Sequence, residues 1–325
     1  MKSEYQENQR TRAVKLIQDK NHVFYGGVGG KLFMRSHRDF VLTDFNKNFY
    51  IDIKDEAIEY FSKNCIAWWG GNNPTGHVLS SQIACINHLY ALRNDKNAVL
   101  GLLKSVSTDF VDVLEIKTDK FFSAFIQFES VSDNDYLNEG QSTRGTNCTS
   151  VDALIYAKHK DGTNWLIPIE WKFTEFYEHL DKAKEGCNAN PEKCKGKERQ
   201  RRYTDLINNS NQLVNENHYC YYFEPFYQLM RQTLWAEQMI VNKENETIKA
   251  DNFLHIHVIP SENSDLLEKK YKCSGENMKS TWISHLKNKD KYMIISPKDF
   301  LSNLDSVKYK ELILYLDKRY WNANQ

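Results

Sequence analysis

Residues 150–173 decide the fold, with the sequence SVDALIYAKHKDGTNWLIPIEWKF. Two apolar segments, 151–157 and 165–173, flank a polar segment, 158–164, that contains an Asp-Gly pair. Apolar and aromatic runs of this length are typical of strands, and Asp-Gly is a strong signal for a tight hairpin turn. The stretch therefore predicts two antiparallel β-strands joined by a short turn.

Three charged side chains interrupt these apolar strands. Glu170 and Lys172 are two residues apart, so strand geometry places them on one face, and the hairpin lays Asp152 against their strand. Buried charges must be paired or bound to a metal ion. A surface hairpin with a cross-strand salt bridge is the alternative, but both strands are too apolar to be freely exposed. We therefore expect two carboxylates and one ammonium group to converge.

This trio of residues suits the hydrolysis of phosphodiester bonds. The oxygens of Asp152 and Glu170, with a backbone carbonyl and waters, form a hard oxygen site that favours Mg²⁺, for which Mn²⁺ can substitute. Such an ion polarises a phosphoryl group and lowers the pKa of a bound water. Lys172 is expected to orient that water or to stabilise the charge that develops at phosphorus.

The order of Asp152, a hairpin and Glu170-Trp171-Lys172 resembles the Asp…(Glu/Asp)-x-Lys signature of the PD-(D/E)xK superfamily of restriction-endonuclease-like nucleases. Val151 stands where the superfamily's name has proline. Further segments resemble a family of bacterial restriction endonucleases: N-P-T-G-H at 73–77, S-S-Q at 80–82, R-G at 144–145, T-S-V-D at 149–152 and E-P-F-Y-Q-L-M-R-Q at 224–232. The resemblance implies a mixed central sheet flanked by helices and a Mg²⁺-dependent DNA hydrolase.

The resemblance also implies additional site residues. Members of the superfamily often carry an acidic residue upstream of the Asp, which Glu129 matches as a further catalytic residue and metal ligand. They also carry a polar residue on the helix after the Glu-x-Lys strand, and Gln228 and Arg231 share one face of that expected helix. Arg231 is suited to holding a phosphate bidentately. Arg144, within one of the resembling segments, is a further expected substrate contact.

The most basic run of the chain is 193–203, KCKGKERQRRY. The formal net charge of the chain is zero, from 43 basic and 43 acidic residues, so a DNA-binding protein of this composition needs a local basic surface. Lys197 and Arg201 are therefore expected contacts to the DNA backbone. A solvated helix face is the alternative meaning of the run.

Other segments allow both a functional and a structural interpretation. The Trp- and Gly-rich segment 68–77 is either a substrate-facing loop or a structural loop, since its turn-forming residues alone explain the Gly and Pro content. His77 is not expected to be a catalytic base, and Ser80-Ser81 are expected to cap the following helix. His255 and His257 share one face of an expected half-exposed strand, as alternate strand residues do by default.

The cysteines and the termini bear on the compartment. Seven cysteines is an odd number, and reduced thiols in a cytoplasm fit their scattered positions better than a disulfide framework. Cys187 and Cys194 flank a polar loop, but no further pair of ligands completes a zinc site. No apolar stretch approaches the ~20 residues that cross a bilayer, and the polar N-terminus does not resemble a signal peptide. We expect a cytoplasmic protein with no membrane partner.

Periodicity and composition predict the remaining elements. Helices are expected at 52–64, 78–92, 96–104, 225–241 and 309–320, and strands at 121–128, 253–259 and 292–295. The expected fold class is α/β, with a mixed central sheet flanked by helices. We expect a helical N-terminal region, 1–108, packed on a nuclease core, 109–325, with an inserted polar loop at about 181–200.

The expected function is metal-dependent endonucleolytic cleavage of DNA, in restriction or phage defence. Cutting both strands of a duplex usually needs two active sites, so a homodimer is expected. A nuclease with another biological role, such as repair or junction resolution, is an alternative that the same residues would serve. A catalytically inactive nucleic-acid-binding or assembly subunit with the same fold is a further alternative, and it predicts poor binding of Mg²⁺. A sugar hydrolase with paired carboxylates is the last alternative, although Lys172 has no obvious role in that chemistry.

Overall fold

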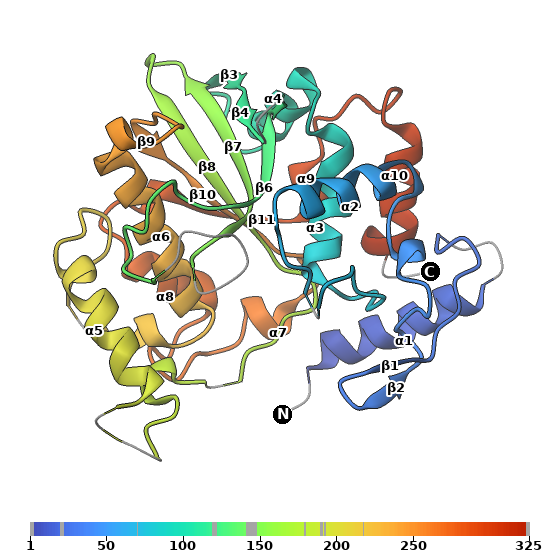
Figure 1. The fold of residues 1–325 in the computed structure, drawn as a ribbon, viewed down its shortest axis with the longest axis horizontal. Helices are drawn as coiled ribbons and strands as arrows, with labels where there is room; N and C mark the ends of the chain where they lie inside the picture. The colour runs from blue at the N-terminus through green and yellow to red at the C-terminus, as the bar shows by residue number, and fades with distance from the viewer. Residues whose placement is uncertain are drawn as a thin grey trace.

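The computed structural model describes residues 3–19, 23–69, 71–118, 122–140, 148–178, 180–188, 191, 193–216 and 218–322 (Figure 1). Within these ranges the helices are α1 (Glu4–Gln18), α2 (Lys54–Lys63), α3 (Ser81–Leu89), α4 (Lys96–Lys104), α5 (Lys195–Asn208), α6 (Phe226–Val241), α7 (Ser264–Leu267), α8 (Met278–Ser284), α9 (Pro297–Phe300) and α10 (Lys310–Leu316). The strands are β1 (Lys31–Phe33), β2 (Ser36–Arg38), β3 (Phe110–Leu114), β4 (Ile116–Lys117), β5 (Ser123–Ala124), β6 (Ile126–Ser130), β7 (Val151–His159), β8 (Asn164–Trp171), β9 (Asn252–Phe253), β10 (His255–Val258) and β11 (Tyr292–Ile295).

A seven-stranded mixed sheet lies at the centre of the molecule. Its main path runs β11-β10-β8-β7-β3, and β6 and β9 add to it beside β7 and β8. The strand β7 is antiparallel to β3, β6 and β8, whereas β8 is parallel to β9 and β10, and β10 is parallel to β11. The expected fold class, α/β with a mixed central sheet flanked by helices, is confirmed.

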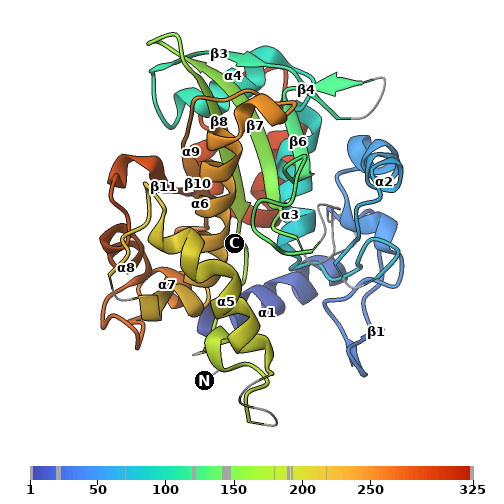
Figure 2. The ribbon, with the colours of Figure 1, turned by 60° about the vertical axis from the view of Figure 1, so that its left-hand side comes forward.

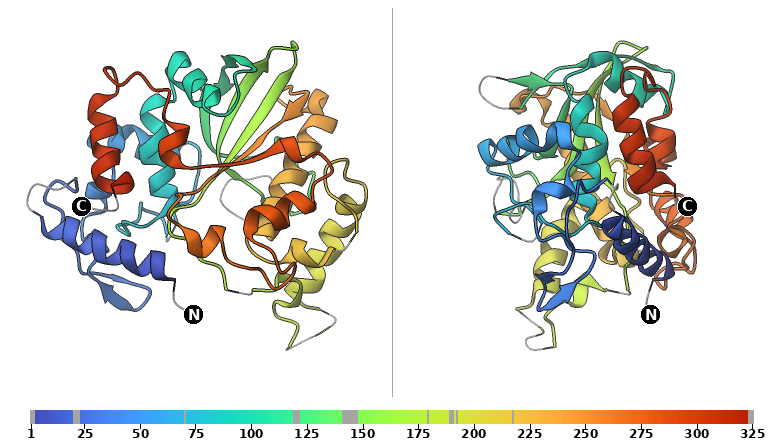
Figure 3. Two further views of the ribbon diagram at one scale, coloured as in Figure 1. Left: turned by 180° about the vertical axis from the view of Figure 1, so that it is seen from behind. Right: turned by 90° about the vertical axis from the view of Figure 1, so that its right-hand side faces the viewer.

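Helices cover both faces of this sheet, with a separate hydrophobic core on each (Figures 1 and 3). One core joins the sheet to α3, α4, α10 and the N-terminal residues, and the other joins it to α5, α6 and α8. Ile169 and Trp171 belong to the first core, whereas Leu166 belongs to the second. Because side chains alternate along β8, Glu170 therefore faces α6.

The predicted hairpin at the centre of the sequence is confirmed. The strands β7 and β8 pair from Ala153 opposite Ile169 to Lys158 opposite Asn164, and Gly162 in the turn adopts a φ of 86°. Such a positive φ favours glycine, which explains the Asp-Gly signal. The helix at 96–104 and the strand at 292–295 have the predicted bounds, and α6 begins one residue later than predicted.

Several predicted elements are divided in the structure. The predicted strand 121–128 is two strands, β5 and β6, and its residue 121 lies outside the described residues. The predicted strand 253–259 is likewise β9 followed by β10, which pair with different parts of β8. The predicted helices 52–64, 78–92 and 309–320 each contain a short 3₁₀ or π turn besides an α-helix. Periodicity identifies a buried face but not the local change of hydrogen-bond register.

The N-terminal region contains two short strands besides its predicted helices. It carries the antiparallel hairpin of β1 and β2, far from the central sheet in Figure 1. Its buried side chains, among them Phe61 and Leu102, share one core with Ile155 of β7 and Leu316 of α10. The division of the chain at residue 108 stays a prediction.

The structure corrects the expectation that all cysteines are reduced thiols. Disulfide bonds join Cys187 to Cys194 and Cys220 to Cys273, with Cα–Cα distances of 4.9 Å and 5.2 Å. These separations suit a disulfide, and spacing along the sequence alone does not reveal them. Cys187 and Cys194, bonded to each other, are not available as zinc ligands. No helix in the described part of the chain is long and apolar enough to cross a membrane.

Candidate active site

Three carboxylates and a histidine lie in one row across four neighbouring strands. The register of β6 on β7 places Glu129 beside Asp152, and the register of β7 on β8 places Asp152 beside Glu170. On the other side of Glu170, the paired residue of β10 is His257. The two sequence-predicted carboxylates of the hairpin are thus neighbours on the α6 face of the sheet, as the alternation of side chains predicts.

A backbone hydrogen bond fixes the carboxylate of Asp152. Its Oδ2 accepts a hydrogen bond of 2.7 Å from the N–H of Trp171, which separates Glu170 from Lys172 in the sequence. Burial, and then the charges of Glu170 and Glu129, raise the pKa of Asp152 well above its usual value. The cluster of carboxylates therefore disfavours its own full ionisation and favours a nearby cation.

Lys172 and Glu170 form a buried ion pair. The Nζ of Lys172 lies 2.5 Å from Oε1 of Glu170, and the two residues are 5% and 2% exposed. The same Nζ donates to Oε1 of Gln228 at 2.7 Å, and Nε2 of Gln228 donates to Glu170 at 2.7 Å. Burial lowers the pKa of Lys172, but the charge of Glu170 and other nearby groups raises it more, so the amine is held in its charged form.

A second glutamine on α6 holds the other oxygen of Glu170. Nε2 of Gln232 donates to Oε2 of Glu170 and to the carbonyl of Ser150, the latter at 3.3 Å. Gln232 is 1% exposed, and its Oε1 has no hydrogen-bond partner among the described residues. Because Gln228 and Gln232 are four residues apart on α6, both point at Glu170 and fix its orientation.

Glu129 sits on a strained backbone. Its φ of 48° lies in the left-handed region, which non-glycine residues rarely adopt. Residues with such strained backbones cluster at functional sites. Its Oε1 accepts a hydrogen bond of 2.9 Å from Gln82 on α3, and its Oε2 accepts one of 3.2 Å from Ser150. Ser80 caps α3 through a hydrogen bond to Ile83, as predicted, which positions Gln82 in the first turn.

Arg231 lies one turn from Gln228 on α6 but binds a different partner. Its Nε donates to Oε1 of Glu139 and to Oγ1 of Thr149, both at 3.1 Å. Glu139 is 7% exposed and also accepts hydrogen bonds from Thr149 at 2.8 Å and from Tyr203 at 2.5 Å. The side chain of Arg231 is 24% exposed, so most of it is buried and these hydrogen bonds fix its position.

Two other expected substrate contacts, Lys197 and Arg201, are not brought to this row of carboxylates. Lys197 and Arg201 are exposed on α5, and Arg201 pairs with Glu198 at 2.9 Å. A surface cavity of about 550 Å³ borders Arg201, Arg202 and Glu198 on this helix. Arg144 lies outside the described residues. The roles of Lys197, Arg201 and Arg144 remain predictions.

Beyond Glu170 the polar row continues into the protein interior. His255 and His257 are 1% and 0% exposed, which corrects the expectation of a half-exposed strand, since α8 and β11 cover β10. His257 Nδ1 lies 3.0 Å from the hydroxyl of Tyr292. Burial, and then the charge of Lys172, lower the pKa of His255 to about 3 and shift that of His257 in the same direction. Both rings are therefore neutral beneath Lys172.

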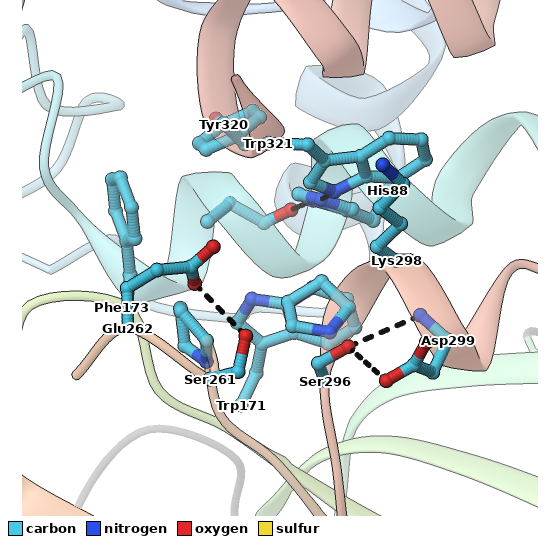
Figure 4. Close-up of a pocket in the computed structure, with 13 residues that line it drawn as sticks. His88, Trp171, Phe173, Ser261, Glu262, Ser296, Lys298, Asp299, Tyr320 and Trp321 are labelled. Atoms are coloured by element: carbon cyan, nitrogen blue, oxygen red, sulfur yellow. Dashed lines mark hydrogen bonds between the residues drawn. The ribbon is translucent and has the colours of Figure 1, made fainter. Parts of the chain in front are cut away.

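The opposite face of β8 holds a cavity of about 130 Å³, lined by Trp171 and the C-terminal residues Tyr320 and Trp321 (Figure 4). Nε1 of Trp321 donates to Nε2 of His88 at 3.1 Å, and Nδ1 of His88 lies 2.7 Å from the carbonyl of Ala84. His88 is thus a neutral, satisfied residue. The aromatic packing anchors Trp171, and with it the two charged residues on either side of it.

The donor chemistry of the carboxylate row fits a hard divalent cation, because carboxylate oxygens are the ligands that Mg²⁺ prefers. Oδ1 of Asp152 accepts no hydrogen bond from the described residues, whereas both oxygens of Glu170 are engaged by Lys172, Gln228 and Gln232. No group of three or more His, Cys, Asp or Glu close enough to hold a metal occurs within the described ranges. A metal bound here would need side chains of the row to turn toward it.

Sequence reasoning missed three partners of the expected site residues. Gln232 was recoverable from its spacing, since it lies one helical turn after Gln228. Gln82 and Glu139 bind their partners across 47 and 92 residues of sequence, and no local pattern indicates such pairs.

Comparison with known proteins supports the interpretation of the fold. The model of one protein family, described as restriction endonuclease associating with ARP, matches residues 7–321. Searches among curated proteins and among solved structures found no match. The matched region includes the carboxylate row, Lys172, α6 and the N-terminal hairpin. The chain therefore belongs to the family of restriction endonucleases associating with ARP.

Proposed function

We propose that this protein is a divalent-metal-dependent endonuclease that hydrolyses phosphodiester bonds in DNA, with Asp152, Glu170 and Lys172 as its catalytic residues. The observation that carries the proposal is the convergence of two carboxylates and a charged, buried amine on one face of the sheet. The hydrogen bond from Trp171 to Asp152 holds this arrangement together. Membership of a restriction-endonuclease family supports the same reaction class.

Asp152 and Glu170, assisted by Glu129, would hold Mg²⁺ or Mn²⁺. When bound, such an ion supplies Lewis-acid activation of the scissile phosphate and of a water molecule. The raised pKa of Asp152 supports this role, because burial and neighbouring charges leave its carboxylate in need of a positive partner. The three carboxylates come from three adjacent strands, and a rigid sheet keeps their backbones in place.

Lys172 would orient the attacking water and stabilise charge on the phosphate. Its Nζ is held by Glu170 and Gln228, so it does not have to be ordered during the reaction. Charged neighbours keep its pKa high, which suits an electrostatic role rather than that of a general base. Arg231, oriented by Glu139, would engage a phosphate neighbouring the scissile one.

The experiment incubates purified protein with plasmid and linear DNA in Mg²⁺, Mn²⁺ or EDTA. The wild type is expected to cut in either metal and not in EDTA. Lys172→Ala should lose cutting while its circular dichroism stays unchanged, whereas Lys158→Ala, an exposed lysine on the same hairpin, should cut like the wild type. Undiminished cutting by a folded Lys172→Ala protein would place the active site elsewhere.

A catalytically inactive binding or assembly subunit is the second candidate. The engagement of both Glu170 oxygens by Lys172, Gln228 and Gln232 favours it, because those contacts satisfy the carboxylate without a metal. The family description, which names an association with ARP, is also compatible with an assembly role. Calorimetric titration with Mg²⁺ and Mn²⁺ separates the candidates, since the inactive subunit predicts no binding that depends on Asp152.

A further inference from the structure

The β1–β2 hairpin carries like charges directly opposite one another. Lys31 on β1 pairs in register with Arg38 on β2, so their side chains share one face of the hairpin. Like charges at directly opposed positions destabilise an antiparallel pair. No ion pair with an acidic residue compensates either side chain within the part of the chain that the structure describes. Such a pair is most stable when an external anion lies against it.

The tip of the same hairpin presents an apolar and a cationic side chain. Met34 is 72% exposed and adopts a φ of 45°, and the exposed Arg35 adopts a φ of 70°. Two consecutive non-glycine residues in the left-handed region form a strained turn, and such strain often marks functional segments. Leu32, on the outer face of β1, is 58% exposed. The hairpin therefore projects both cations and apolar groups into solvent.

Aromatic rings contact the hairpin beside its turn, through Phe33. Phe33 lies 5.3 Å from the ring of Trp69 and 5.0 Å from that of His77. Gly29 leaves no room for a side chain, since a Cβ there would lie 1.9 Å from the carbonyl of Asp39. Trp69 and His77, from the segment 68–77 that has two interpretations from sequence, thus form a platform against which the hairpin packs.

This platform is linked to the carboxylate row. The N–H of Trp69 donates to Oε1 of Gln82 at 2.9 Å, and Nε2 of Gln82 donates to Glu129 at 2.9 Å. In Figures 1 and 2 the hairpin and α5 lie toward the same end of the molecule, on opposite sides of it, and the β7–β8 turn lies at the other end. The β1–β2 hairpin and α5, both rich in basic residues, thus lie on either side of the end of the sheet that carries Asp152 and Glu170.

We propose that the β1–β2 hairpin, residues 31–38, is a DNA-contacting element that holds a duplex against the active site through Lys31, Arg35 and Arg38. The phosphate backbone supplies the anions that the opposed cations lack. A two-stranded ribbon fits a groove of duplex DNA, and the apolar tip at Met34 suits contact with base edges. This inference rests on the proposed function, because it assumes that DNA is the substrate of the carboxylate row.

The test measures the affinity for a fluorescein-labelled DNA duplex by anisotropy, in EDTA and over a series of salt concentrations. The test variant is Lys31→Ala/Arg35→Ala/Arg38→Ala, and the matched control is Lys104→Ala/Lys158→Ala/Lys310→Ala, which removes three exposed lysines elsewhere. We expect the hairpin variant to bind about tenfold or more weakly and to reduce the slope of log K against log salt by about three. The control should bind like the wild type.

Equal affinities of the hairpin variant and the control, or a wild type that binds no duplex, would overturn the inference. If the hairpin triple variant fails to fold, Arg35→Glu at the exposed tip makes the same measurement, with a weaker affinity expected. Cleavage is measured in a separate assay, so the proposed nuclease function and the proposed role of the hairpin can fail independently. Duplex binding that depends on the hairpin but leads to no cleavage overturns only the nuclease function, whereas cleavage with unchanged binding overturns only the role of the hairpin.

Discussion

The carboxylate of Asp152 accepts a hydrogen bond of 2.7 Å from the backbone N–H of Trp171. This contact joins the start of β7 to the end of β8, and Trp171 separates the two charged residues Glu170 and Lys172 in the chain. The indole of Trp171 packs on the other face of the sheet, so the same residue anchors the strand and positions the carboxylate. The site is thus built by backbone geometry as much as by its side chains.

Replacing Asp152 by Asn is expected to stabilise the metal-free protein at neutral pH. The pKa of Asp152 is raised in the folded state, so the unfolded state loses its proton more readily than the folded state does. The contribution of this carboxyl to the free energy of unfolding is therefore fully present below its pKa in the unfolded state, about 3.9. That contribution is lost as the pH rises through its pKa in the folded state. Thermal unfolding at pH 4 and pH 8 should show that the advantage of the variant grows with pH.

Addition of a divalent metal should make the wild type more stable than Asp152→Asn. Mg²⁺ is expected to raise the melting temperature of the wild type by mass action and to leave Asp152→Asn unchanged. Asn keeps an oxygen that accepts the hydrogen bond from Trp171, so the variant tests the charge and not the fold. A wild type that shows no stability deficit at pH 8 and no response to Mg²⁺ would argue against a metal site at this carboxylate.

Gln228 is expected to act as a positioning residue for Lys172. Gln228→Leu removes the acceptor that holds the Nζ and the donor that holds Glu170, so the cleavage rate kcat should fall by about 10–100-fold with a smaller change in KM. The control is Gln238→Leu, on the same helix but bonded to Asn242. Equal kinetics of the two variants would show that the bridge of Gln228 does not position the amine.

The pair of Glu139 and Arg231 is expected to be coupled. Glu139→Leu leaves a guanidinium that is largely buried without its carboxylate, which should destabilise the protein by about 3–5 kcal/mol. Arg231→Met in the same protein should recover a large part of that loss, and urea unfolding of the four combinations measures the coupling. Additive losses in this cycle would mean that Arg231 is not held by Glu139. Arg231→Met alone should weaken DNA binding.

The sequence was sufficient to predict the parts of the site that are local. The hairpin of residues 151–171 was predictable because strand composition and an Asp-Gly turn act over short distances. The presence of Gln228 on the helix that faces Glu170 followed from a family resemblance. The strands β1 and β2 were not predictable, because each has three residues and none of their residues is buried. Short exposed strands carry no alternation of apolar and polar residues.

The contacts that complete the site were beyond sequence reasoning. Gln232 reaches Glu170 across 62 residues of sequence, and Glu129 depends on Gln82 from a helix 47 residues earlier. The burial of His255 and His257 was missed because it results from the parallel strand β11, which adds an outer strand to the sheet. Long-range packing, rather than local propensity, decides all of these features.

Single-turnover hydrolysis of a labelled DNA duplex by wild-type and Glu170→Gln proteins in saturating Mg²⁺ tests directly whether the carboxylate row cleaves DNA. Gln is similar in size to Glu and retains one oxygen, so its side chain can still accept a hydrogen bond from a glutamine of α6. The substitution removes only the negative charge. We expect cleavage by the wild type and none by the folded variant. Cleavage by Glu170→Gln at the wild-type rate would show that Glu170 is not a catalytic residue.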